Sequence, residues 1–168
     1  IREHLRANRS TLVFANSRRL CEKLTFLINQ DQEELLAYAH HGSLAKEIRA
    51  EVERNLKAGA LKAILATGSL ELGIDIGALD EVILVQAPWS VAEAVQRIGR
   101  AGHGVGQISR GTFLTAHPAD MVNSAVVARA VVQGDIEPLL PLAAPLDVLA
   151  QVLLSMLAFD AWHPDELY

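Results

Sequence analysis

The hydrophobic positions of this chain follow two alternating patterns. Short apolar runs rich in β-branched residues predict buried strands, and segments with apolar residues three or four positions apart predict helices. We expect strands at 11–15, 36–40, 62–67, 81–86 and 111–115, and helices at 17–30, 45–58, from 90 onward, at 118–133 and at 146–159. This alternation is typical of parallel β-α-β units, so the sequence predicts an α/β fold with a mainly parallel central sheet.

The composition changes after Gly134. Three prolines, at 138, 141 and 145, punctuate a short connector before the last long helix, which is apolar on more than one face. Such a helix needs cover on several sides, which so few residues cannot supply. We therefore expect one domain over residues 1–136, a connector and the truncated start of a second domain over 137–168, and a natural protein that continues beyond Tyr168.

Charge and composition narrow the function classes. The 168 residues include 15 Lys and Arg against 20 Asp and Glu, a net charge of −5, which argues against gripping nucleic acid by bulk charge. No run approaches a membrane span and no charged-then-apolar leader appears at the start, so we expect a soluble, cytoplasmic protein with no membrane partner. The single Cys21 forbids an internal disulfide and falls on an apolar helix face, where core packing is favoured over reactivity.

The stretch QRIGRAGHGVG, residues 96–106, carries two arginines beside four glycines. Arg97 and Arg100 share one helix face with Glu93, so a structural role is open: both charges suit a helix C-terminus, and Arg97 can pair with Glu93 at the surface. Glycines so dense cost stability unless the backbone must turn sharply or approach something closely. Arginine is suited to transferred phosphoryl oxygens, so the stretch favours a finger acting on the terminal phosphate of a nucleotide held by another domain.

A second group of residues follows the predicted strand at 62–67, in ATGSLELGIDIG. Thr67 and Ser69 offer hydroxyls and backbone N–H groups to a phosphate, and Asp75 beyond Gly73 can accept from a ribose hydroxyl or orient an arginine. The alternative is a turn with hydroxyl caps. Because ligand sites in such sheets lie beyond the carboxyl ends of the strands, we expect most of these motifs at that edge.

Two further loops precede helices. Ser17, Arg18 and Arg19 place cations at a helix start, which marks an anion site unless the arginines are simply solvated. In HHGSL, Ser43 is a candidate helix cap, and Gly42 can let the backbone approach a nucleic-acid strand. His40 and His41 have no Cys or carboxylate at matching spacing, so no metal site is expected.

Missing motifs are equally informative. The chain has no G-x-x-x-x-G-K-[ST] phosphate loop, and its glycines do not fit G-x-G-x-x-G. Asp80 and Glu81 precede their apolar run instead of following one, unlike the metal-binding acid pair of a nucleotide hydrolase. We expect no hydrolysis by this chain alone.

Together these stretches resemble the second RecA-like domain of superfamily 2 helicases, and in particular the large helicase-related (Lhr) family of ATP-dependent DNA helicases. TLVFANSRRLCEKL resembles helicase motif IV, HHGSL the segment after it, ATGSLELGIDIG motif V and QRIGRAGH motif VI. The resemblance covers roughly residues 10–117, and PLDVLAQ at 145–151 is similar to the opening of the winged-helix domain that follows in Lhr proteins. It implies a RecA-like three-layer α/β/α domain followed by the helical start of a winged-helix-like domain.

The resemblance also implies roles for individual residues. Arg100 would be the arginine finger and Arg97 would help to shape the same site, while Gly73 and Asp75 would contact the nucleotide. The nucleic-acid backbone would be contacted by five residues: Ser17, Arg18, Gly42, Thr67 and Ser69. His103 stands where many superfamily 2 helicases have a third arginine, which fits the Lhr pattern.

The same resemblance implies the ligands and partners. ATP and Mg²⁺ would be bound mainly by an N-terminal RecA-like domain of the same protein, and the track would be single-stranded DNA or a DNA/RNA hybrid. Two other interpretations remain open. One is a non-catalytic module, derived from a helicase half, that binds protein or nucleic acid; the other is a doubly wound phosphate-binding enzyme, which lacks a nucleophile or base near the glycines.

Overall fold

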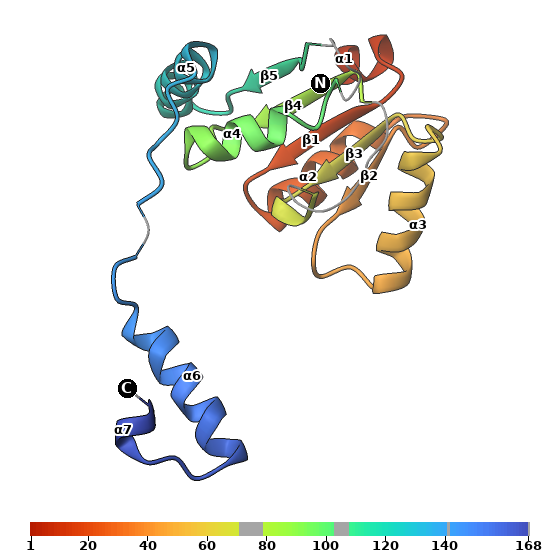
Figure 1. Ribbon diagram of the computed structural model, residues 1–168. Coiled ribbons are helices and arrows are strands. Elements are labelled where there is room, and N and C mark those ends of the chain that lie inside the picture. The colour runs from red at the N-terminus through yellow and green to blue at the C-terminus, as the bar shows by residue number, and fades with distance from the viewer. Residues whose placement is uncertain (71–78, 103–107, 141, 168) are drawn as a thin grey trace. The chain divides into compact units, whose positions relative to one another are not determined.

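The core of the protein is a five-stranded parallel sheet (Figure 1). The computed structural model describes residues 1–70, 79–102, 108–140 and 142–167. The strands are β1 (Thr11–Ala15), β2 (Ala37–His40), β3 (Ala63–Ala66), β4 (Glu81–Val85) and β5 (Gly111–Leu114), in the order β2-β3-β1-β4-β5. Central β1 pairs in parallel with β3 and with β4, so the carboxyl ends of all the strands meet at one edge.

Side chains alternate between the two faces of the sheet, which builds two cores. On one face, Leu12 and Phe14 of β1 pack with helices α3, α4 and α5. On the other face, Val13 and Ala15 pack with α1 and α2. These helices are α1 (Arg2–Ala7), α2 (Arg18–Asn29), α3 (Lys46–Lys57), α4 (Val91–Ile98) and α5 (Pro118–Gln133). The predicted α/β class with three layers and a parallel sheet is confirmed.

Helix ends follow the local sequence signals. Ser17 caps α2 by accepting a hydrogen bond from the Leu20 amide at 3.2 Å, and Ser90 caps α4 by accepting from the Glu93 amide at 3.1 Å. The helix α5 ends at Gly134, whose φ of +70° is the left-handed conformation that glycine adopts without strain. The two serine caps fix where the chain enters a helix after β1 and after β4.

The first helix, α1, was not predicted. Its six residues lack a long apolar stripe, and tertiary contacts hold it in place. Arg2 donates hydrogen bonds to the carbonyl oxygens of Leu27, Ile28 and Gln30 at the end of α2, and Leu5 is fully buried. These contacts lie more than twenty residues apart, so no local pattern reveals them.

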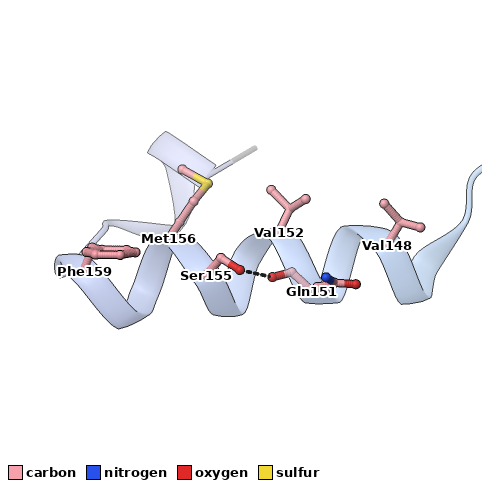
Figure 2. Close-up of a pocket in the computed structure, with 6 residues that line it drawn as sticks. All are labelled: Val148, Gln151, Val152, Ser155, Met156 and Phe159. Atoms are coloured by element: carbon pink, nitrogen blue, oxygen red, sulfur yellow. Dashed lines mark hydrogen bonds between the residues drawn. The ribbon is translucent and has the colours of Figure 1, made fainter. Parts of the chain in front are cut away.

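The chain divides into two compact units, Ile1–Glu137 and Pro138–Tyr168. The second unit contains α6 (Leu146–Phe159) and α7 (Pro164–Leu167). Along α6 a hollow of about 440 Å³ is lined by Val148, Val152, Met156 and Phe159 together with Gln151 and Ser155 (Figure 2). The Ser155 hydroxyl donates to the Gln151 carbonyl oxygen of its own helix, and none of the described lining side chains is titratable.

Candidate nucleotide and nucleic-acid site

Three neighbouring strand ends hold the residues expected to contact nucleic acid. Ser17 and Arg18 follow β1, Gly42 follows β2, and Thr67 and Ser69 follow β3. Because β2, β3 and β1 are adjacent, these residues lie along one stretch of the carboxyl edge. The structure therefore brings the predicted group together.

The loops after β1 and β2 are joined by a hydrogen bond. Arg18 donates from Nη1 to the Ser43 hydroxyl oxygen at 2.5 Å. The expected cap by Ser43 is wrong, because α3 begins three residues later and its N-cap position is Ala45, which has no side-chain cap. The Ser43 hydroxyl instead orients an exposed arginine at the sheet edge.

A buried histidine joins the loops after β2 and β3. His40 is 1% exposed; its Nδ1 lies 2.9 Å from the Ser69 hydroxyl oxygen, and its Nε2 lies 2.9 Å from Oε1 of Glu53 on α3. The Ser69 hydroxyl also donates to the His40 carbonyl oxygen at 3.0 Å. The Ser69 hydroxyl has one proton to donate, and the two His40 atoms within reach are the ring nitrogen Nδ1 and the carbonyl oxygen. Ser69 thus holds the loop together. The contact between Glu53 and His40 joins α3 to β2, so residue spacing did not indicate a role for Glu53.

The neighbouring histidine, His41, points elsewhere. Its Nε2 lies 2.6 Å from Oε1 of Glu22 on α2, so the two histidines do not share a site. Among the described residues no group of three or more His, Cys, Asp or Glu side chains is arranged to hold a metal.

The loops that would touch a ligand present open backbone. Gly42 is exposed, and a Cβ atom placed on it would meet nothing within 4 Å. Thr67 is partly exposed, and its amide donates to the His40 carbonyl oxygen at 3.4 Å. Gly73 and Asp75, predicted to contact the nucleotide, and His103 lie outside the described residues.

Arg97 is a buried cation that fixes α4 against the sheet. It is 4% exposed, pairs with Glu93 one turn earlier, and donates from Nη1 to Oδ1 of Asn16 at 3.0 Å. Its guanidinium carbon lies 5.0 Å from the centroid of the Phe14 ring, within range of a cation–π contact. The pairing with Glu93 was predicted at the surface, but only Glu93 is partly exposed; Arg97 is buried because its side chain reaches Asn16 at the end of β1.

Arg100 lies beyond the end of α4, away from the carboxyl edge where most motifs were expected. Two residues after Arg100, the Gly102 amide donates to the carbonyl oxygen of Leu79, just before β4, at 3.3 Å. Arg100 therefore lies near the amino end of β4. A helix that returns from a parallel strand runs antiparallel to it, so its last turn reaches the amino ends of the strands. Arg100 is partly exposed there.

The acid pair Asp80 and Glu81 serves the fold. Asp80 accepts from the backbone amides of Arg9 and Ser10 and from the Arg9 guanidinium, and Glu81 accepts from Thr112 and Asn8. Both acids lie at the amino end of β4, opposite the loops after the strands. Their carboxylates are thus held in structural contacts at the edge away from the candidate grip.

Comparison with known proteins supplies the family. Residues 1–104 match the model of the helicase conserved C-terminal domain. The chain is 45% identical over 194 residues to the Lhr helicase/probable uracil glycosylase of Mycolicibacterium smegmatis, covering 93% of this chain and 13% of that protein. It is 39% identical to the ATP-dependent helicase Lhr-Core protein 2 of Thermococcus barophilus, covering 99% of this chain and 20% of that protein.

A solved structure is also similar. The helicase Lhr of Mycobacterium smegmatis, bound to ssDNA and AMP-PNP, superposes with a TM-score of 0.92 at 48% identity, over 99% of this chain and 22% of that one. The chain thus spans about a fifth or less of the lengths of these relatives. No helix among the described residues has the length and apolar character needed to cross a membrane.

Proposed function

This chain belongs to the helicase conserved C-terminal domain family, and from that premise we propose that it is the second motor domain of a longer Lhr-like, ATP-dependent helicase or translocase. The whole protein would couple ATP hydrolysis to movement along nucleic acid, in the cytoplasm. ATP and Mg²⁺ would be held mainly by an N-terminal RecA-like domain with its own phosphate loop and acid pair. The second unit, which contains α6, would begin a winged-helix-like domain.

The observation that carries this proposal is the placement of Arg100. It follows directly on the C-cap of α4, Gly99, and α4 is fixed to the sheet by the buried Arg97. Arg97 would therefore shape the site, and Arg100 would reach the terminal phosphate across the cleft between the two motor domains. Gly73 and Asp75 would contact the nucleotide from the same side. A finger of this kind contributes about three to five orders of magnitude in rate.

The second half of the proposal is a grip on the nucleic-acid backbone. Ser17, Arg18, Gly42 and Thr67 would contact the sugar-phosphate chain of single-stranded DNA or a DNA/RNA hybrid, and Ser69 would support them by holding the loop that carries Thr67. Contacts of this type position a strand and carry little sequence information. They also allow an acidic domain to hold a polyanion, because the contacts are local.

The test is Arg100→Ala in the full-length protein, with Arg54→Ala, an exposed arginine on α3, as the matched control. We expect Arg100→Ala to lose nucleic-acid-stimulated ATP hydrolysis and to keep nucleotide-free binding of single-stranded DNA. Arg54→Ala should keep both. Normal ATP turnover in Arg100→Ala would overturn the finger, and failure of the wild type to bind single-stranded DNA would overturn the grip.

A further inference from the structure

A hollow at the carboxyl edge lies beside the proposed grip and is used by none of the roles described above. Its volume is about 560 Å³, and five of its lining residues carry polar or aromatic side chains: Asn16, Gln86, Trp89, Asp120 and Asn123. Asn16 follows β1, Gln86 follows β4, and Asp120 and Asn123 lie in the first two turns of α5, which follows β5. Asn16 directly precedes Ser17, so the hollow continues the line of loops proposed to hold the strand.

Trp89 presents an exposed aromatic ring from a turn whose backbone is held by a hydrogen bond. Its side chain is 91% exposed, while its backbone amide donates to Oε2 of Glu93 at 2.9 Å and its neighbours are Pro88 and the α4 cap Ser90. An indole is a large apolar surface that proteins rarely leave to water unless it meets a ligand or a partner. A fixed backbone with an open ring face is the arrangement of a stacking platform.

The rest of the hollow's wall is apolar at Ala87, Pro88, Val126 and Val127 and polar at four other residues. Asn16, Gln86 and Asn123 supply amides, Asp120 supplies a carboxylate, and none of the described lining residues is a lysine or arginine. A phosphate would meet the Asp120 carboxylate, and the neighbouring cation, the Arg97 guanidinium, already bonds Glu93 and Asn16, so the hollow is a poor anion site. An uncharged ring with donors and acceptors on its edge fits both the indole and the amides.

The Asn16 amide is held in place before any ligand arrives. Asn16 donates from Nδ2 to the Ala87 carbonyl oxygen at 2.8 Å, and its Oδ1 accepts from Arg97. Gln86 has a φ of +72°, a left-handed conformation that is uncommon for a residue with a Cβ atom. Strain of this kind clusters at ligand sites, where the surrounding structure maintains it.

We propose that this hollow binds one unpaired nucleobase of the nucleic-acid strand, stacked on the Trp89 indole with its edge toward Asn16, Asn123 and Asp120. The proposal rests on the proposed nucleic-acid grip and adds a base site to it. Because every base has a π-face, stacking would tolerate any sequence. The site would set the position of a base next to the backbone contacts of Ser17 and Arg18.

The experiment is an abasic scan with the full-length protein. A single abasic residue is moved along a short single-stranded DNA, and the dissociation constant is measured for wild type, Trp89→Ala, Trp89→Phe and Phe26→Ala. Phe26 is an exposed aromatic residue on α2 outside the hollow, so its variant controls for loss of surface aromatic area. Circular dichroism and thermal unfolding confirm that each variant is folded.

For wild type we expect one position at which the abasic residue weakens binding about tenfold, the loss that removal of one base stack brings. Trp89→Ala should weaken binding of intact DNA similarly and lose sensitivity at that position, whereas Trp89→Phe and Phe26→Ala should keep it. A scan that Trp89→Ala does not change would overturn the base site while leaving the grip intact. A wild-type scan with no position-dependent effect would also overturn the base site, and absence of DNA binding by wild type would instead refute the proposed grip.

Discussion

The hydroxyl of Ser69 and the imidazole of His40 join two loops that follow neighbouring strands. The oxygen of Ser69 lies 2.9 Å from Nδ1 of His40 and donates to the His40 carbonyl oxygen at 3.0 Å, while Glu53 holds the other ring nitrogen. Ser69, His40 and Glu53 are thus linked by hydrogen bonds, and His40 in the middle is almost fully buried beneath the exposed edge. The loop that carries Thr67 is therefore positioned from below.

Removing the hydroxyl should destabilise this chain. Ser69→Ala leaves a buried ring nitrogen without one partner, which costs about 1–3 kcal/mol of unfolding free energy. Glu53→Gln is the matched control, because its amide oxygen can still accept a hydrogen bond from the ring. Urea unfolding measures both, and equal stability of Ser69→Ala and wild type would show that the hydrogen bonds contribute nothing net.

The two arginines of motif VI should separate in their effects on stability. Arg97→Ala removes the buried guanidinium and its contacts with Glu93 and Asn16, while the half-buried Glu93 keeps its hydrogen bond from the Trp89 amide, so we expect a loss of about 1–3 kcal/mol. Arg97→Lys should also lose stability, since a lysine cannot replace a planar group that bonds Asn16 and covers the Phe14 ring. Arg100→Ala should cost less because Arg100 is partly exposed. Urea unfolding of the three variants checks this, and equal losses at 97 and 100 would contradict it.

The thiol of Cys21 should be unreactive in the folded chain. Burial raises its pKa to about 11 from the ordinary value of 9.0, although the His40 backbone opposes that shift, and the thiol donates to the Leu65 carbonyl oxygen. Two units of pKa lower the thiolate fraction about a hundredfold at pH 8. A thiol-specific chromogenic reagent should label the native chain at least that much more slowly than the chain in urea; similar rates would refute the buried thiol.

Much of the fold is readable from local pattern. The strand Thr11–Ala15 and the helices Pro118–Gln133 and Leu146–Phe159 have the predicted bounds, because period and caps are local properties. The helix Arg2–Ala7 was missed because Arg2 anchors it to backbone carbonyls of a distant helix. The wrong cap at Ser43 has a similar cause, since Arg18 from another loop uses that hydroxyl.

The candidate site was predictable in kind and less so in detail. Hydroxyls, glycines and arginines after strands indicated which loops matter, since parallel strands place their carboxyl ends at one edge. The roles of Glu53 and Asn16 depend on which elements pack together, which spacing in the sequence does not encode. The position of Arg100 also depends on the return direction of α4, and that direction places it away from the expected edge.

Stability should fall in acid through Glu81. Burial alone would raise the pKa of Glu81, but hydrogen bonds from Thr112, Asn8 and His4 outweigh burial and lower it below the ordinary value of 4.5. A carboxylate whose pKa is lower in the folded state contributes fully above pH 4.5, and the contribution is lost as the pH falls through the folded pKa. Glu81→Gln should therefore cost about 1–3 kcal/mol at pH 7 and progressively less below pH 4.5. Urea unfolding across pH 3–7 tests this; a constant difference between variant and wild type would contradict it.

Gly42 offers the cleanest separation of binding from folding. A Cβ atom added there meets nothing within 4 Å, and the backbone is not left-handed, so Gly42→Ala should leave the unfolding free energy unchanged. If a nucleic-acid strand lies against this backbone, the new methyl group stands between them. We expect single-stranded DNA binding by the full-length protein to weaken by about 1 kcal/mol, roughly a factor of five.

Gly134→Ala is the matched control for Gly42→Ala. It too has open space around the added atom, but its φ of +70° makes any side chain strained, and it lies at the end of α5. We expect this variant to lose about 1 kcal/mol of stability and to bind DNA as wild type does. Gly42→Ala should thus lose DNA binding and keep its stability, whereas Gly134→Ala should lose stability and keep DNA binding. Urea unfolding measures the stability, and fluorescence anisotropy with labelled DNA measures the binding. If Gly42→Ala binds DNA as wild type does, the strand does not lie against Gly42, and that loop is removed from the proposed grip.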